Sequence, residues 1–378
     1  MTPWLLVAGD FAPLGGMDAA NHALARYLAA RGEVHLVTHR VWPDLTALPN
    51  VTVHRAWRPF NRHALGTALL SCAGRRVWRG LRPRGAHVVV NGGNCCVPGA
   101  NWVHYLHAAY APTTAGSVGR RVKSALTYRR DLADERRALR AARVVICNSR
   151  RTRADVIERV GIAESRVHVV YYGSDPERLA PVRAAKRAAA KATLFRAADR
   201  PLVGFVGALG DRRKAFDTVF AAWTILCRRA DWDADLVVVG SGAELPRWRE
   251  RAAEEGLRDR IRFAGFRDDV PELMAAFDAV VHPARYEAYG LSVHEALCRG
   301  IPALVSASAG VAERYPPELG ELLIGDPDDA GEVSDRLLFW RRNSIRFREA
   351  VMPLSALLLA RTWDVMAEQL ATLVERTA

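Results

Sequence analysis

The stretch that decides the fold is 282-HPARYEAYGLSVHEAL-297, in which Glu287 and Glu295 stand eight positions apart. It follows Ala279-Val280-Val281, an apolar β-branched run typical of a buried strand. Its last part, continuing to 299, has the apolar spacing of a helix. The stretch therefore predicts a strand, a loop that carries Glu287, and a helix that carries Glu295 beyond its first turn.

The start of that helix is a potential anion site. Gly290 stands at the turn, and the first N–H groups of a helix have no intrahelical acceptor, so they can bind a phosphate. A ligand whose phosphate binds there would have one end near Glu287 and the other near Glu295. Carboxylates accept hydrogen bonds from vicinal hydroxyls. A nucleotide sugar has this layout of hexose, diphosphate and ribose. The alternative is that both glutamates are solvated, as most glutamates are.

Length and composition indicate a two-domain globular protein. The chain has 378 residues, more than a single core usually supports, and 50% of them are hydrophobic. No apolar run reaches the roughly 18 residues of a membrane span, and residues 1–10 indicate a strand rather than a signal peptide. Six cysteines without a CxxC pair predict reduced thiols in a cytosolic protein, with no disulfide framework and no structural metal.

The formal net charge is +13, from 54 Lys+Arg against 41 Asp+Glu. Such an excess suggests an acidic partner such as nucleic acid, anionic lipid or a phosphorylated substrate. GC-rich coding, which inflates arginine content, is the alternative without functional meaning.

Short apolar strands alternate with helical patterns through both halves of the chain. The expected strands are 4–8, 34–38, 87–91, 143–147, 167–170, 202–207, 236–240, 261–265, 279–281 and 303–306, and the clearest helices are 19–30, 151–159 and 216–226. This alternation predicts an α/β protein with two doubly wound parallel sheets. We expect a first domain over 1–180, a polar linker over 181–200, a second domain over 201–352 and a terminal helix over 353–378.

Two further loops at the carboxyl ends of strands could hold a diphosphate, since ligands of such sheets bind at that edge. Gly15 and Gly16 follow the first strand and could bring backbone N–H groups close to a phosphate. The loop from Gly207 to Lys214 follows the first strand of the second half and adds Arg212 and Arg213. Each loop could equally be an ordinary solvated turn.

No metal is expected at this site. Asp231-Trp232-Asp233 resembles a metal-binding DxD, but it precedes the strand at 236 and so belongs to the opposite edge of the sheet. We interpret it as surface. Without a metal, the cations of the 207–214 loop and the helix starts would neutralise a departing diphosphate.

With these motifs the chain resembles the family 4 retaining glycosyltransferases of the GT-B fold. In that family two Rossmann-like domains face a central cleft that holds a nucleotide sugar. The resemblance runs nearly end to end, through Gly15-Gly16, 145-VICNS-149, 173-GSD-175, 205-FVG-207 with Lys214, 239-VGSG-242, 262-RFAG-265, 287–302 and 361-RTWDVMAE-368. The last motif is similar to the family's terminal segment, where the final helix crosses back to the first domain.

The resemblance implies roles for individual residues. Glu287 would contact the transferred sugar, Glu295 the ribose hydroxyls, and Lys214 with Arg213 the diphosphate. His107 matches the family histidine near the reacting carbon, whereas His104 would be packed in the same element. Glu287, His107, Lys214 and Arg213 are thus the expected catalytic residues. The expected donor contacts are Gly15, Gly16, Gly207, Arg212, Phe266, Ala288, Tyr289, Gly290, Leu291 and Glu295, those of 288–291 through backbone amides.

Two positions depart from the family pattern. Ala208 stands where an arginine usually follows Phe-Val-Gly, and Val311 stands where a second glycine usually follows Gly310. Arg212 or Arg213 would have to supply the missing charge, or activity is reduced.

The implied function is transfer of a hexose, with retention of configuration, from a UDP- or GDP-linked sugar to a hydroxyl of a glycan or glycolipid. No metal and no separate cofactor are expected, and the protein would be cytoplasmic and act in polysaccharide biosynthesis. The basic segment 118–142 could rest on an anionic membrane surface, although a solvated Arg/Glu helix is the simpler interpretation.

Two other functions stay open at this point. The same fold hosts sugar-nucleotide epimerases and inactive sugar-nucleotide binders. A basic nucleic-acid-binding protein is suggested by runs such as 120-RRVK-123, but no binding motif or aromatic pattern accompanies them. We therefore expect no nucleic-acid partner.

Overall fold

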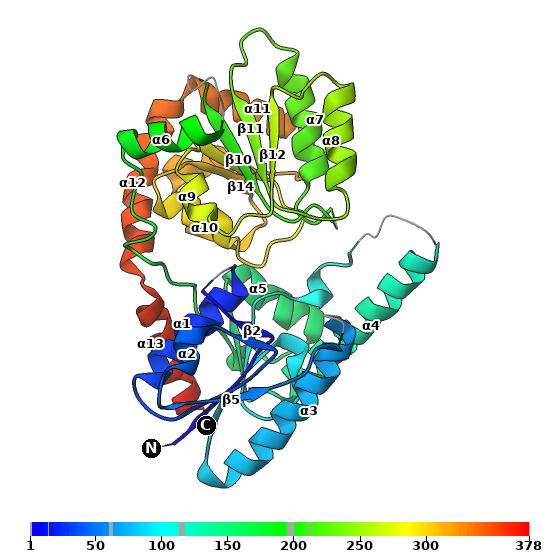
Figure 1. The fold of residues 1–378 in the computed structure, drawn as a ribbon, viewed down its shortest axis with the longest axis vertical. Coiled ribbons are helices and arrows are strands. Elements are labelled where there is room, and N and C mark those ends of the chain that lie inside the picture. Colours follow the sequence, from blue (N-terminus) through cyan, green and yellow to red (C-terminus); the bar gives the residue numbers. More distant parts are fainter. Residues whose placement is uncertain are drawn as a thin grey trace. The chain divides into compact units, whose positions relative to one another are not determined.

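The computed structural model describes residues 2–13, 15–59, 63–112, 118–194, 200–210 and 212–377. The chain divides into two compact units. Unit 1 comprises Met1–Gly173 and Arg361–Ala378, and unit 2 comprises Ser174–Ala360 (Figure 1). Among the described residues, no helix is long and apolar enough to cross a membrane.

Unit 1 is built on a seven-stranded parallel sheet in the order β5-β3-β1-β6-β7-β8-β9. The strands are β1 (Trp4–Val7), β3 (Val34–Thr38), β5 (Val51–Arg55), β6 (His87–Asn91), β7 (Ala100–Val103), β8 (Val144–Cys147) and β9 (Val167–Val169), and β2 (Asp10–Phe11) pairs with β4 (Arg40–Val41) beside them. The central strands are continuous apolar runs because both faces of a parallel sheet are covered by helices.

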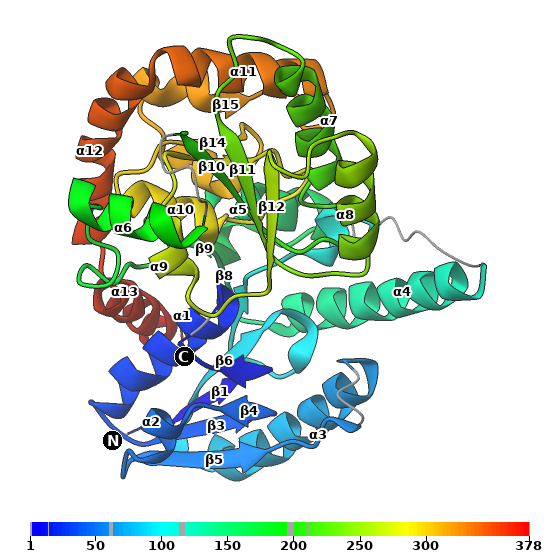
Figure 2. The same cartoon turned by 45° about the horizontal axis from the view of Figure 1, so that its top comes forward.

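The helices of unit 1 cover both faces of this sheet. They are α1 (Met17–Ala29), α2 (Pro43–Thr46), α3 (His63–Leu81), α4 (Val118–Ala141), α5 (Arg150–Asp155) and α13 (Trp363–Arg376). Leu70 of α3 packs into the core with Leu5 and Val88, while α13 packs against α1. Figure 1 shows α3 on one side of the strands and α1 with α13 on the other. In Figure 2, α4 extends well beyond the sheet.

Unit 2 contains a six-stranded parallel sheet in the order β12-β11-β10-β13-β14-β15. Its strands are β10 (Leu202–Val206), β11 (Asp235–Val239), β12 (Ile261–Gly265), β13 (Ala279–His282), β14 (Ala303–Ser306) and β15 (Leu323–Ile324). Its helices are α6 (Ala184–Leu194), α7 (Phe216–Cys227), α8 (Leu245–Glu254), α9 (Val270–Met274), α10 (Leu291–Cys298), α11 (Ala330–Arg342) and α12 (Ser344–Ala360). The strand order reverses between β10 and β13, and ligands of doubly wound sheets bind at such a point.

The expected α/β class with two parallel sheets is confirmed, and every strand expected from the apolar runs is present within one or two residues. Sequence reasoning missed β5, β7 and β15, as well as the two-residue strands β2 and β4. β5 is an edge strand that is only half-buried, β15 has two residues, and β7 interrupts its apolar run with Asn101. These strands lack the continuous apolar run that identified the others.

The unit boundaries differ from the expected domain limits. The chain passes between units at Gly173 and again at Ala360, whereas a linker was expected over 181–200 and a terminal helix from 353. Helix α6 occupies most of the expected linker. Its residues Arg187 and Lys191 form ion pairs with the buried Asp278 at 3.4 and 2.6 Å, which attach the helix to unit 2. The polar composition of this segment thus reflects ion pairing within unit 2.

Candidate functional site

The loops that follow β10 and β13 lie side by side in unit 2. The two strands pair in parallel, with Gly204 opposite Val280, so their carboxyl ends meet at one edge. Arg285 joins the loops: its backbone N–H donates to the Arg213 carbonyl at 2.9 Å, and its guanidinium donates to Asp217 at 2.8 Å. The carbonyl of Arg212 accepts a further bond from Arg285 at 2.5 Å. The sequence therefore brings the 207–214 loop and the Glu287 loop together through a half-buried arginine.

Four charged or titratable side chains meet in this place. The Oε2 atom of Glu287 accepts hydrogen bonds from the Lys214 Nζ and, at 3.0 Å, from the His282 Nε2. The Arg213 guanidinium lies 3.9 Å from the same oxygen and donates to the Tyr286 carbonyl at 3.3 Å. The side chains of Glu287 and Lys214 are 12% and 14% exposed, so the pair is largely removed from water. We call Arg213, Lys214, His282 and Glu287 the acid-base cluster.

Electrostatics fix the charges of this cluster. Burial alone would raise the pKa of Glu287, but Lys214, His282 and Arg213 together hold it well below its usual range. Burial, together with Lys214, lowers the pKa of His282. His282 is therefore a neutral ring that donates its Nε2–H to an ionised Glu287. Sequence reasoning quoted His282 but gave it no role; its position as the last residue of β13, at the ligand edge, was the available signal.

Helix α10 begins beside the cluster with free backbone N–H groups. Its N-cap, Gly290, has φ +107° and makes no side-chain capping bond. The N–H of His294 is the first that bonds back to Gly290, at 3.0 Å, which leaves those before it for a ligand. A Cβ at Gly290 would lie 3.1 Å from Val311 Cγ1 and 3.3 Å from Glu287 Cγ, so the turn requires glycine.

The remaining residues of this turn are placed by the core. Ala288 and Tyr289 are buried. The Tyr289 hydroxyl bonds to His294 Nδ1 at 2.8 Å, and the other ring nitrogen of His294 bonds to Ser174 at 2.8 Å. The side chain of Tyr289 is thus occupied within the core, which leaves its backbone as the part that could meet a ligand.

Glu295 lies in the second turn of α10 and is half-buried. Burial raises the pKa of its carboxyl to about 7, while Arg178 and Arg299 oppose the rise. Its carboxylate has no hydrogen-bond partner within the described ranges of the chain, unlike Glu287. Glu295 is therefore a polar group available to a ligand.

Three further residues of unit 2 were expected to contact the donor: Gly207, Phe266 and Arg212. Gly207 gives room to Lys214, because a Cβ there would lie 3.2 Å from Lys214 Cγ. Phe266, just beyond β12 at the same edge of the sheet, is 78% exposed and free to stack on a ring. Arg212 has φ +56° and an exposed side chain, whereas the Arg213 guanidinium lies 3.9 Å from Glu287, so Arg213 is the arginine of the cluster.

In unit 1, Gly15 and Gly16 lie in the loop between β2 and α1. Gly15 has φ +76°, and Gly16 is the N-cap of α1 without a side-chain capping bond. Asp18 stands in the first turn, where burial and the nearby Asp10 raise its pKa to about 6. A phosphate at this helix start would meet that carboxyl.

The two histidines of the 104–107 segment have different surroundings. His104 is buried, bonds to the Tyr172 hydroxyl at 2.5 Å, and has its pKa lowered by burial to about 3. It is a packed residue, as expected. His107 bonds through Nδ1 to Glu135 at 2.9 Å and remains 32% exposed. Sequence reasoning missed Glu135, which stands 28 positions away on α4.

Two family models cover most of the chain: Glycosyltransferase Family 4 matches residues 14–178, and Glycosyl transferases group 1 matches residues 200–341. The 2-deoxystreptamine N-acetyl-D-glucosaminyltransferase of Streptomyces fradiae is 30% identical over 373 residues, which cover 87% of this chain and 83% of that protein. The chain belongs to glycosyltransferase family 4.

Solved structures show that this glycosyltransferase has the GT-B fold. Sucrose-phosphate synthase from Thermosynechococcus elongatus matches with a TM-score of 0.79 at 23% identity, over 100% of this chain and 99% of that one. Anabaena HepE, in complex with UDP and glucose, matches with a TM-score of 0.73 at 18% identity, over 99% of each chain. The fold expected from the resemblance is confirmed.

The DxD-like motif of the glycosyltransferase lies on the surface, as interpreted. Asp231 pairs with Arg342 at 3.0 Å and Asp233 with Arg341 at 2.6 Å, which ties the turn before β11 to α11. In the part of the chain that the structure describes, no group of three or more His, Cys, Asp or Glu side chains could hold a metal ion.

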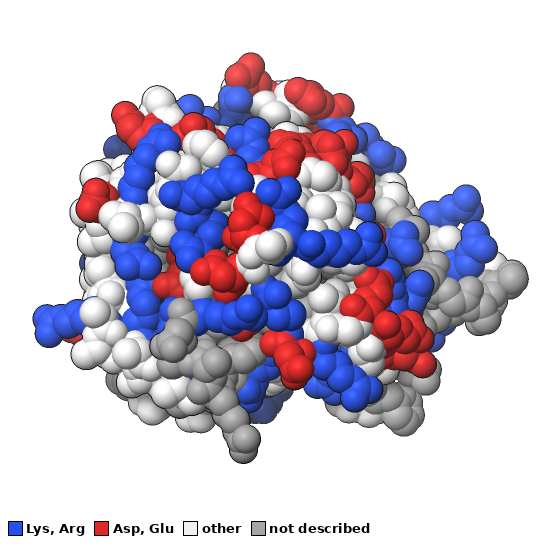
Figure 3. All heavy atoms as spheres, turned by 90° about the horizontal axis from the view of Figure 1, so that it is seen from above, with Lys and Arg blue, Asp and Glu red and all other residues white. Residues whose placement is uncertain are grey.

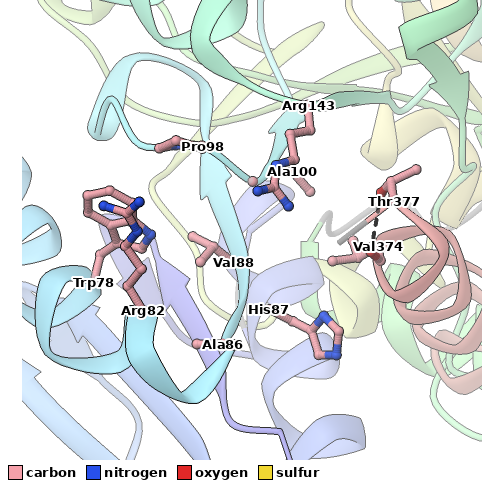
Figure 4. Close-up of a pocket in the computed structure, with 12 residues that line it drawn as sticks. Trp78, Arg82, Ala86, His87, Val88, Pro98, Ala100, Arg143, Val374 and Thr377 are labelled. Carbon is pink, nitrogen blue, oxygen red and sulfur yellow. Dashed lines mark hydrogen bonds between the residues drawn. The ribbon is translucent and has the colours of Figure 1, made fainter.

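The positive charge of the glycosyltransferase is spread among acidic residues. Figure 3 shows Lys and Arg side chains interspersed with Asp and Glu over one face of the molecule. A cavity of about 330 Å³ lies in unit 1, and its lining includes Trp78, Arg82, His87 and Arg143 (Figure 4). His87 and Ala100 begin β6 and β7, so this cavity is at the amino edge of the unit 1 sheet, opposite the edge at which Gly15 and Gly16 follow the strands of the same unit.

Proposed function

We propose that this glycosyltransferase moves a hexose from a UDP-linked sugar to an acceptor hydroxyl, with retention of configuration and without a metal. The observation that carries the proposal is the acid-base cluster at the β10–β13 switch point, beside the free start of α10. HepE has been solved with UDP and with UDP-glucose, and this supports uridine as the base.

Each part of the cluster has a chemical role in this proposal. The α10 N–H groups, Lys214 and Arg213 neutralise the diphosphate, because cations and helix starts stabilise the charge that develops on a leaving group. Glu287, kept ionised, accepts hydrogen bonds from the hydroxyls of the transferred sugar and so orients it. Glu295 accepts bonds from the ribose hydroxyls, and Phe266 offers a face to the base.

The reaction follows from this arrangement. The bond between the anomeric carbon and the β-phosphate oxygen breaks, and the acceptor oxygen bonds to that carbon from the same face. The acceptor proton passes to the departing phosphate oxygen. No side chain need form a covalent bond, since positioning and charge neutralisation lower the barrier.

The acceptor class is a separate part of the proposal. A glycan or glycolipid hydroxyl is the first candidate. A small aminocyclitol is the second, because the relative that matches 87% of the chain acts on 2-deoxystreptamine.

A binding and turnover experiment tests the proposal. UDP, GDP and ADP are titrated into the intact protein with EDTA present, and UDP-glucose and UDP-N-acetylglucosamine are then supplied with glycan or aminocyclitol acceptors. We expect selective UDP binding that Glu295→Gln weakens, and turnover that Glu287→Gln abolishes while UDP binding persists. An α-linked product from the α-linked donor, seen in the anomeric proton coupling, shows retention. Strict dependence on a divalent metal, or an inverted product, would refute the mechanism.

A further inference from the structure

Glu135 is a buried carboxylate in a helix that is otherwise rich in solvated charge. It is 1% exposed on α4, although its neighbours Arg136 and Arg137 face solvent. Burying a carboxylate is costly unless hydrogen bonds replace the lost water. The partners of Glu135 therefore show what its position achieves.

Within the part of the chain that the structure describes, the three hydrogen bonds of Glu135 go to the turn that begins at His107. Its Oε2 accepts from the His107 backbone N–H at 2.7 Å and from His107 Nδ1 at 2.9 Å, and its Oε1 accepts from the Ala108 N–H at 3.1 Å. The Tyr128 hydroxyl, about two turns earlier on α4, donates to the His107 carbonyl at 3.0 Å. Both the backbone and the ring of His107 are thus held from α4.

These contacts determine the form of the imidazole. The ring donates its Nδ1–H to the carboxylate, so in the neutral form the lone pair lies on Nε2. Within the described residues Nε2 has no hydrogen-bond partner, while the side chain is 32% exposed. Nε2 is therefore the nitrogen that can meet a ligand.

We propose that Glu135 is a positioning residue of the transfer reaction, which fixes His107 so that Nε2 accepts the hydrogen bond of the acceptor hydroxyl. This inference rests on the proposed function for the reaction, and only on unit 1 for the geometry. Nε2 accepts this hydrogen bond while the acceptor binds. When the bond between the anomeric carbon and the phosphate oxygen breaks, the hydroxyl hydrogen turns to the departing oxygen, which takes the proton, so the ring neither gains nor loses one.

The charges around His107 predict how the transfer rate should depend on pH. Burial would lower the pKa of His107, but the hydrogen bond and charge of Glu135, with the charge of Asp131, raise it above its ordinary value. Both carboxyl groups belong to α4, and the Tyr105 ring lies edge-on at 5.0 Å. Since the neutral ring is the active form, the rate should rise with pH through this raised pKa.

The first test needs no substrate. The intact protein is labelled with ¹⁵N-histidine, and the His107 signals are assigned by their absence in His107→Gln. We expect an Nδ1-protonated ring with a pKa above the ordinary value of about 6.5, and a lower pKa in Glu135→Gln. A ring protonated on Nε2, or the same titration in both proteins, would overturn the inference.

The second test separates positioning from folding. Glu135→Gln should lower kcat about 100-fold, the usual order for a misplaced reacting group, and move the acid limb of the rate to lower pH. UDP affinity, which depends on unit 2, should stay unchanged, and Glu135→Gln should add no loss in a His107→Gln background. Independent losses in the double variant would assign Glu135 to folding alone.

Two further outcomes are decisive. If Glu135→Gln does not fold, Glu135→Asp replaces it, and normal kinetics with a displaced ring would contradict the inference. If the wild-type protein transfers no sugar although His107 titrates as expected, the proposed function fails and the geometry of the pair stands.

Discussion

Replacing Glu295 by glutamine should stabilise unit 2 at pH 8 but not at pH 5. Burial raises the pKa of this carboxyl from its ordinary 4.5 to about 7. Between these values the native state holds a proton that the unfolded chain releases. Stability therefore falls as pH rises from 4.5, and the loss is complete above pH 7. A neutral amide of the same shape avoids that loss.

The size of the effect follows from the shift. The rise from 4.5 to about 7 corresponds to at most about 3 kcal/mol. Glu295 is only half-buried, so water screens part of this, and we expect about 1–2 kcal/mol. For a unit of this size each kcal/mol moves the midpoint by about 2–4 °C, which predicts a gain of roughly 2–8 °C at pH 8.

Differential scanning calorimetry of the intact protein at both pH values provides the assay. Glu272→Gln is the matched control, because Glu272 is an exposed carboxylate near Glu295. The same variant should bind UDP more weakly, so stability and binding move in opposite directions. A Glu295→Gln protein that is no more stable at pH 8, or equally stabilised at pH 5, would refute the reasoning.

Three further substitutions probe the acid-base cluster and the adjacent turn. Lys214→Met leaves Glu287 buried without its main partner and should cost about 3 kcal/mol in urea unfolding at pH 7; adding Glu287→Leu should recover most of that loss. Gly290→Ala forces a side chain into φ +107° and should cost about 1–3 kcal/mol and weaken UDP binding in calorimetric titration. Arg213→Ala should lower kcat/KM more than Arg212→Ala, because only the Arg213 guanidinium approaches Glu287; equal losses would contradict the assignment.

Local sequence patterns were sufficient to predict most of the strands and site loops of unit 2. The strands are continuous apolar runs, and the Glu287 and Lys214 loops follow them directly, so the parallel order alone brings these loops to one edge. The sequence could not reveal that His282 would be buried between them, because an isolated histidine at a strand end gives no sign of its partners. The pairing of Asp278 with α6 was hidden for the same reason: its partners stand some 90 positions away.

In unit 1, local sequence patterns were not sufficient to predict the contacts of the candidate site. The Arg/Glu pattern of α4 predicts a solvated helix, and most of its charges are exposed. Glu135 departs from that pattern, and nothing in its sequence neighbourhood marks it. Its burial depends on the 104–108 segment, which the tertiary fold brings to α4. A pattern that averages over a helix therefore misses the buried carboxylate that contacts a predicted site residue.

The geometry of the loops shows what surrounds Ala208 and Val311, the two departures from the family pattern. Ala208 is exposed and contributes no charge, but Arg285 holds the Arg213 carbonyl and so directs the adjacent loop toward Glu287. The cluster then contains Lys214 and Arg213 against one carboxylate, which leaves a net positive charge for a diphosphate. The Val311 side chain lies beside Gly290, and the Val311 backbone N–H donates to the Tyr289 carbonyl at 2.7 Å. The turn that would bind phosphate is therefore hydrogen-bonded to its neighbours and lies beside two cations despite both departures, and this supports the proposal of a competent donor site.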